Sequence, residues 1–227
     1  MEPRLRAAFA LIERLTLEPE RFAPADVERA RTSGLRDEAV VDAIFVCAGF
    51  NLIDRVADAL DFFVPPDFRR GAPIVQKLGY WWMSATWPSE AGVPRSGRER
   101  KEALFRRLED AILRAPGALE AGTRAGIAEE REVPEPLRPY VAKVFRHAYK
   151  VTDEDVAALR AEGFSEDQIF EVTLAAAFGA AAKRLRNGLG AVADGARPSQ
   201  PAVEERFTSS SRSHAHRVPA SARSTSS

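Results

Sequence analysis

The chain has very few of the side chains that carry redox or metal chemistry. Its 227 residues include one cysteine, Cys47, and three histidines. A single cysteine cannot form a disulfide within the chain, and there is no CxxC pair or cysteine–histidine cluster. The sequence therefore excludes dithiol chemistry within one chain and a structural zinc site, and we expect neither a metal nor a cofactor.

The signature motifs of several enzyme classes are also missing. There is no Gly-x-Ser-x-Gly elbow, phosphate-binding loop, dinucleotide fingerprint or HExxH helix. His214 and His216 lie in a polar C-terminal stretch, so a catalytic triad would have to use His147. Few residues of the chain can therefore be assigned to a known catalytic mechanism.

Charge gives no indication of a partner. The chain has 33 basic and 33 acidic residues, so its net charge is zero and shows no footprint for nucleic acid or a membrane surface. The N-terminal residues form an amphipathic pattern instead of a secretory signal, and no uncharged run is long enough to cross a bilayer. We expect a cytoplasmic protein without nucleic-acid or membrane partners.

Apolar residues recur at helical spacing along most of the chain, and no segment shows the period-two alternation of a strand. The sequence thus predicts an all-α fold. The stretch 67–94, which contains Trp81, Trp82 and Trp87, is expected to be an irregular aromatic cover over the core or a subunit contact. Helices are predicted over residues 4–17, 24–32, 37–60, 96–114, 117–129, 137–149, 153–162 and 165–189.

The C-terminal 33 residues differ in composition from the rest. Residues 195–227 contain nine serines and a single aromatic residue, Phe207. Such a segment cannot bury enough apolar surface to offset its ordering entropy. We therefore expect one helical domain over 1–194 followed by a disordered tail.

Two stretches of the chain match at a constant offset of 129 residues. Residues 42–54 and 171–183 each have an acid, eleven uncharged residues and then a charge, and Gly34 matches Gly163 in the same register. The pattern predicts a duplicated two-helix unit over about 24–60 and 153–189. Because an uncharged window of eleven residues is too short to span a membrane, we expect both long helices to be buried and to pack together about a pseudo-twofold axis.

The first long helix carries a polar stripe inside its uncharged surroundings. At 100° per residue, Cys47, Asn51, Asp54 and Asp58 lie on one side, with Arg55 at the border. A neighbouring guanidinium could lower the pKa of the thiol and make it reactive. The alternatives are that Cys47 is a small buried residue and that the polar groups form a structural network at a helix crossing.

The catalytic candidates are therefore Cys47, Asn51, Arg55 and the body's one histidine, His147. For His147 the alternative is a core or interface histidine with satisfied hydrogen bonds. Arg184 matches Arg55 in the repeat, whereas Cys47 becomes alanine there. Because both stretches keep the arginine while the cysteine is lost, a structural role is favoured for Arg55.

These residues resemble a known family. Asp37-Glu-Ala-Val-Val-Asp42, followed by Phe50-Asn-Leu-Ile-Asp-Arg-Val-Ala-Asp58, is similar to a helix of peroxidase-related proteins in the alkylhydroperoxidase D-like, carboxymuconolactone decarboxylase superfamily. Residues 151–156 and 163–169 resemble the same unit again. The resemblance implies an all-α fold and homo-oligomers. For the peroxidase branch it also implies a CxxC pair with a histidine and an upstream glutamate, and none of these residues can be placed here.

Two functions from different classes follow from the sequence. One is a peroxide- or small-molecule-handling oxidoreductase of this superfamily, built around Cys47, Asn51, Arg55 and His147 instead of a dithiol. The other is a catalytically silent helical oligomer that binds a small ligand or a protein partner. The decarboxylase branch needs no cysteine, so acid–base chemistry also stays open.

Overall fold

A computed structural model describes residues 2–62 and 97–196. These residues form helices and short helical turns without a strand, which confirms the predicted all-α fold. The tryptophan segment and the serine-rich tail, apart from its first residues, lie outside the described ranges. The α-helices are α1 (Pro3–Leu17), α2 (Pro24–Thr32), α3 (Asp37–Ala59), α6 (Gly97–Glu109), α7 (Ala121–Ala128), α8 (Arg138–His147), α9 (Asp153–Ala161) and α10 (Glu166–Gly195).

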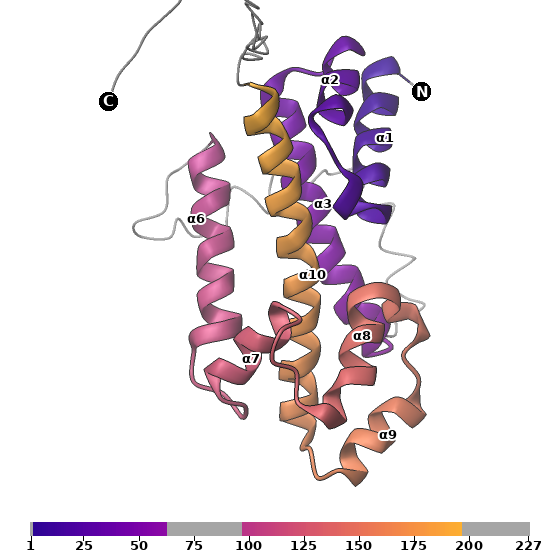
Figure 1. Ribbon diagram of the computed structural model, residues 1–227, viewed down its shortest axis with the longest axis vertical. Coiled ribbons are helices and arrows are strands. Elements are labelled where there is room, and N and C mark those ends of the chain that lie inside the picture. The colour runs from indigo at the N-terminus through magenta and orange to yellow at the C-terminus, as the bar shows by residue number, and fades with distance from the viewer. Residues whose placement is uncertain (1, 63–96, 197–227) are drawn as a thin grey trace, which may run out of the picture. The chain divides into compact units, whose positions relative to one another are not determined.

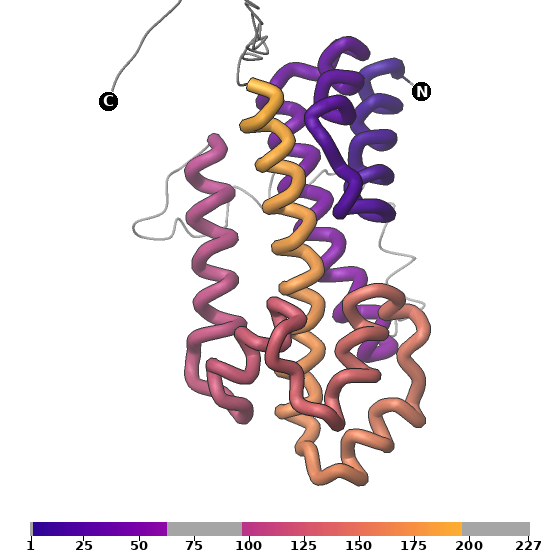
Figure 2. Tube along the Cα trace, in the orientation of Figure 1, coloured from indigo at the N-terminus to yellow at the C-terminus, as the bar shows by residue number. Residues whose placement is uncertain are grey.

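The two long helices, α3 and α10, form the centre of the fold. They run side by side in opposite directions and make the most extensive contact between any two elements of the described residues (Figure 1). Helices α1 and α2 pack at one end of this pair, and α8 and α9 lie at the other (Figure 2). Helices α6 and α7 lie along α10. The predicted packing of the long helices against each other is therefore observed.

The second half begins its helices at the predicted capping boxes. The Asp155 carboxylate accepts a hydrogen bond from the Thr152 backbone N–H at 3.0 Å. The Ser165 hydroxyl accepts one from the Gln168 N–H at 3.2 Å, and the Gln168 side chain accepts one from the Ser165 N–H at 2.9 Å. These bonds satisfy N–H groups that have no partner inside a helix.

Element positions recur at the offset of 129 residues. Both bounds of α2 and α9 differ by 129, as do the starts of α3 and α10. Gly34 and Gly163, which follow α2 and α9, have the same φ of 93°, a left-handed conformation that favours glycine. The single-turn 3₁₀ helices η1 (Pro19–Arg21) and η4 (Ala148–Lys150) also recur at this offset. An origin by duplication stays a prediction.

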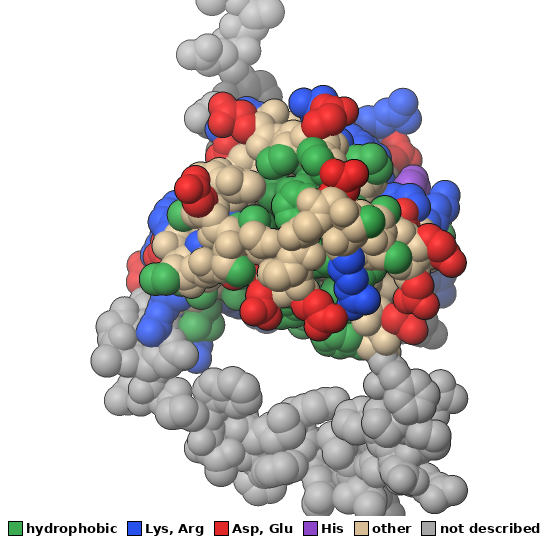
Figure 3. Space-filling view, turned by 90° about the horizontal axis from the view of Figure 1, so that it is seen from below, with side chains coloured by type: hydrophobic (Ala, Val, Ile, Leu, Met, Phe, Trp, Pro, Cys, Tyr) green, Lys and Arg blue, Asp and Glu red, His purple; other side chains and the backbone are tan. Residues whose placement is uncertain are grey.

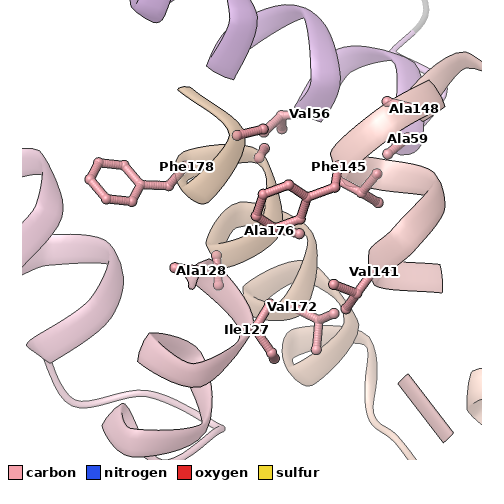
Figure 4. Packing of buried hydrophobic residues seen from close by; sticks show 14 of the residues in the cluster. Val56, Ala59, Ile127, Ala128, Val141, Phe145, Ala148, Val172, Ala176 and Phe178 are labelled. Atoms are coloured by element: carbon pink, nitrogen blue, oxygen red, sulfur yellow. The ribbon is translucent and has the colours of Figure 1, made fainter. Parts of the chain in front are cut away.

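Small residues let α10 approach its neighbours closely. Ala176 and Ala180 are fully buried, and Figure 4 shows the Phe145 ring between Val56 of α3 and Ala176 of α10. A side chain at Gly179 would collide with the backbone of Ala128 on α7. The core around α10 thus depends on the absence of larger side chains from that helix.

Four helices differ from their predicted extents. Helix α10 continues past Leu189 to Gly195, because its last two turns pack on α2, with Gly195 next to Pro24 and Arg31. The helix expected over 96–114 ends in a π-helical segment, η2 (Asp110–Arg114), for which the sequence carries no signal. The expected helices 117–129 and 137–149 shorten to α7 and α8, the latter preceded by the 3₁₀ turn η3 (Glu135–Leu137).

The uncharged windows of the two long helices differ in how they are covered. The α10 window is buried except at half-buried Leu174. The α3 window leaves one face open, where Val46, Phe50 and Ile53 are 49%, 60% and 62% exposed. The corresponding residues of α10, Ala175, Gly179 and Ala182, are buried, and α10 packs against α7 and η2. The expectation that α3 is covered on nearly all sides is therefore wrong for this face.

Candidate functional site

The predicted polar stripe of α3 divides into a buried part and an exposed part. Cys47 and Asn51 are 1% and 6% exposed, Arg55 is half-buried, and Asp54 and Asp58 are exposed. A helical wheel gives the direction of a side chain but not which neighbour covers it. The first two residues of the stripe lie under α1, whose last residue is Leu17, and the two aspartates are not covered.

Thr16, in the last turn of α1, completes the buried part of the stripe. Its hydroxyl lies 3.3 Å from the Cys47 Sγ and accepts a hydrogen bond from the Asn51 Nδ2 at 3.2 Å. The same Asn51 amide donates to the Cys47 carbonyl at 2.9 Å. A threonine inside an amphipathic helix gives no sequence signal for this role.

The surroundings of Cys47 keep its thiol neutral. Burial raises the pKa of the Cys47 thiol, and the hydrogen bonds from Thr16 and Asn51 and the charges of Arg184 and Arg55 offset this only in part. The thiol is also almost fully covered. The geometry therefore favours the interpretation of Cys47 as a small buried residue over that of an activated nucleophile.

Arg55 joins α3 to the end of α8. Its Nη1 donates to the Asn51 Oδ1 at 2.6 Å and to the Asn51 carbonyl at 3.2 Å. Its Nε donates to the carbonyl of Phe145, in the last turn of α8, at 3.3 Å. Carbonyls in the last turn of a helix lack intrahelical partners, so a cation there caps the helix.

Arg184 makes the equivalent connection from α10 to α1. Its Nε and Nη2 donate to the carbonyl of Thr16 at 3.2 and 2.8 Å, and its Nη1 donates to the Ala180 carbonyl at 2.8 Å. Thr16 and Phe145 differ by 129 positions, as do Arg55 and Arg184. Each long helix thus caps a short helix of the other half, in the arrangement expected of a pseudo-twofold axis.

The two guanidinium groups are close enough to affect each other. Burial and, to a smaller extent, the charge of Arg184 together lower the pKa of Arg55 to about 10. Burial also lowers the pKa of Arg184. Among the described residues no carboxylate forms an ion pair with either guanidinium, so their direct partners are neutral carbonyl and amide oxygens.

A cavity of about 290 Å³ lies beside Arg184, where the ends of α1 and α8 meet. We call it the junction cavity. His147 lies here and is exposed, with its ring edge-on to Tyr149 at 5.9 Å. It is therefore not a core histidine, and the structure places it beside Arg184. The lining residues are Leu17, Pro19, Glu20, Glu130, Phe145, Arg146, His147, Lys183 and Arg184.

A larger cavity, about 720 Å³, lies between the end of α3, α9 and the start of α10. Figure 3 shows the surface at the lower end of the molecule as drawn in Figure 1, where charged side chains of both signs surround apolar ones. The ionisable groups that line this cavity, Asp58, Asp61, Asp153, Arg160 and Glu166, are all exposed. The junction cavity is the stronger candidate because a buried charged group lines it.

Neither a metal site, nor a membrane-spanning helix, nor a known relative points to a function for the described residues. No group of three potential metal ligands occurs within residues 2–62 and 97–196, and no helix in these ranges is long and apolar enough to cross a membrane. Comparison of the chain with protein-family models, curated proteins and solved structures gave no match. The function is therefore inferred from the sequence and the geometry of the chain itself.

Proposed function

We propose that this chain is an alkylhydroperoxidase D-like helical protein that binds a small ligand and has no thiol redox chemistry. The observation that carries the proposal is the burial of Cys47, which is 1% exposed and lies between Thr16 and Asn51. The resemblance of the α3 sequence to that superfamily and the antiparallel pair of long helices support it. The cytoplasmic location expected from the sequence belongs to the same proposal.

Peroxide reduction makes demands that Cys47 does not meet. The reactive form is the thiolate, whereas burial of Cys47 favours the neutral thiol. The sulfenic acid that peroxide would form needs a second thiol to resolve it, and the chain has no other cysteine. An oxidoreductase built on Cys47 is therefore the weaker of the two functions.

We predict that the purified protein reduces hydrogen peroxide no faster than Cys47→Ala does, with a small thiol supplied as reductant. The physical reason is that peroxide cannot reach the covered sulfur. Peroxide consumption followed over time provides the measurement, and a protein that carries the family's dithiol centre serves as the positive control. Turnover that disappears in Cys47→Ala would refute the proposal in favour of the peroxidase-related function.

We also propose a homo-oligomer that forms through the open face of α3. Val46, Phe50 and Ile53 have the spacing of one helical stripe and are all about half exposed or more. Gly49 lies beside them, and a Cβ built on it meets nothing within 4 Å. An apolar face of this kind is typical of an interface, and two copies of a helix can approach closely at a glycine.

Phe50→Glu is predicted to shift the protein to the monomer, because it places a charge in the middle of the proposed interface. The molar mass in solution, measured by light scattering during size-exclusion chromatography, tests this. Phe170→Glu is the matched control, since Phe170 is an exposed phenylalanine at the start of α10. A wild-type monomer, or an oligomer that both variants retain equally, would contradict an interface at α3.

A further inference from the structure

Two guanidinium groups, those of Arg55 and Arg184, lie where α1, α3, α8 and α10 come together. Arg55 and Arg184 bring two guanidinium groups into the interior without a carboxylate among their hydrogen-bond partners. The last turns of α1 and α8, which they cap, each carry about half a negative charge. Asp54 and Asp58 offset the charge of Arg55 from the exposed side, whereas the carboxylate that acts on Arg184, Glu20, is already paired with Lys183. Arg184 is therefore the less compensated of the two guanidinium groups.

The junction cavity opens beside Arg184. Lys183 pairs with Glu20 at 2.8 Å and Arg146 pairs with Glu130 at 3.0 Å on its lining. These two ion pairs cancel, so the charge that they leave is that of Arg184, which is 7% exposed. The cavity is therefore suited to one negative charge, and the two glutamates disfavour a ligand with several.

Arg184 also keeps hydrogen-bonding capacity for a ligand. A guanidinium has five N–H groups, and Arg184 uses three of them in its bonds to Thr16 and Ala180. The other two N–H groups remain for a ligand, and the Arg184 side chain lines the cavity. The rest of the lining includes apolar surface from Leu17, Pro19 and Phe145, which fits an uncharged body attached to the anionic group.

We propose that the junction cavity binds a small monocarboxylate with an apolar body. The carboxylate accepts hydrogen bonds from Arg184 and from Lys183, which exchanges Glu20 for the ligand. The apolar body lies against Leu17 and Phe145. This inference rests on the proposed function, since it names the ligand class of a binding protein without redox chemistry.

Benzoate and benzamide test the proposal, because they share a shape and differ in charge. Isothermal titration of the full chain should show saturable binding of benzoate and binding of benzamide weaker by about tenfold or more, since charge-assisted hydrogen bonds are the stronger class. Lys183→Met should weaken benzoate binding by about tenfold, which corresponds to about 1.4 kcal/mol. Arg186→Met, an exposed arginine on the same helix outside the cavity lining, should bind as the wild type does.

Equal affinity for benzamide, benzoate binding unchanged in Lys183→Met, or no saturable binding to the folded protein would each overturn the assignment. Should Lys183→Met fail to fold, Lys183→Gln provides the same comparison, because it also removes the charge and keeps a side chain of similar length. Failure of the proposed function is a separate result, since it appears as peroxide turnover that requires Cys47, whatever the outcome with benzoate.

Discussion

Gly179→Ala is expected to destabilise the protein by about 2–3 kcal/mol, although alanine is the better helix former. The new methyl group would lie well inside contact distance of the Ala128 carbonyl oxygen and 2.6 Å from the Phe145 Cζ. The Ala128 atom belongs to the backbone of α7 and cannot rotate away. Helix α7 would have to shift from α10, which opens the core around Ile127. Urea unfolding followed by circular dichroism measures the loss.

Gly190→Ala is the matched control for this prediction. Gly190 lies on the same helix, and a Cβ built on it meets nothing within 4 Å. The substitution should therefore stabilise the protein by about 0.5–1 kcal/mol through helix propensity alone. If Gly179→Ala and Gly190→Ala changed the free energy of unfolding equally, the close contact of α7 with α10 would be contradicted.

Arg184→Met is expected to cost about 3 kcal/mol of stability. The methionine retains the apolar stem of the side chain but removes three hydrogen bonds and leaves the Thr16 carbonyl without its cap. Arg55→Met should cost less, because Arg55 is half-buried and only one of its three hydrogen bonds reaches another helix, against two of three for Arg184. Chemical denaturation of both variants measures which substitution lowers the free energy of unfolding more.

The control for the arginine prediction is Arg186→Met, which removes an exposed charge from the same helix. It should change stability by less than about 0.5 kcal/mol. A loss in Arg184→Met no larger than this would show that the cap on α1 is not structural. The reverse order, with Arg55→Met costing more than Arg184→Met, would contradict the difference in burial between the two guanidinium groups.

The helices and most of their starts could be predicted from the sequence because the signals are local. The capping boxes at Thr152 and Ser165, and the glycines at 34 and 163, mark boundaries through the chemistry of neighbouring residues. The end of α10 could not be predicted in this way. Its last two turns are fixed by contact with α2, which is far away in the sequence.

Only the part of the candidate site that lies on α3 could be predicted from the sequence. Helical periodicity placed Cys47, Asn51 and Arg55 on one side of that helix, and the structure shows hydrogen bonds among them. Periodicity could not show that Asp54 and Asp58 are exposed, nor that Thr16 and Arg184 come from other helices to complete the network. The offset of 129 did link Arg184 to Arg55, but it gave no indication that each would cap a helix of the other half.

The two halves of the chain differ in the residues of α3 and α10 that could give the protein a specific function. Cys47 and Asn51 correspond to Ala176 and Ala180 in the repeat, so only the first half carries a polar network beside its arginine. The exposed stripe of α3 corresponds to a covered face of α10. The first half therefore has an exposed apolar stripe and a buried polar network that the second half lacks.

The rate at which Cys47 reacts with an aromatic disulfide reagent in the native protein tests the central claim most directly. We predict a slow reaction at neutral pH that accelerates to the rate of a free thiol when the protein is unfolded in urea, because Cys47 is 1% exposed and burial favours the neutral form of its thiol. Rapid, stoichiometric reaction in the native state, with the protein still folded, would show an accessible thiolate. That result would contradict the structural role of Cys47 and return it to the centre of a catalytic site.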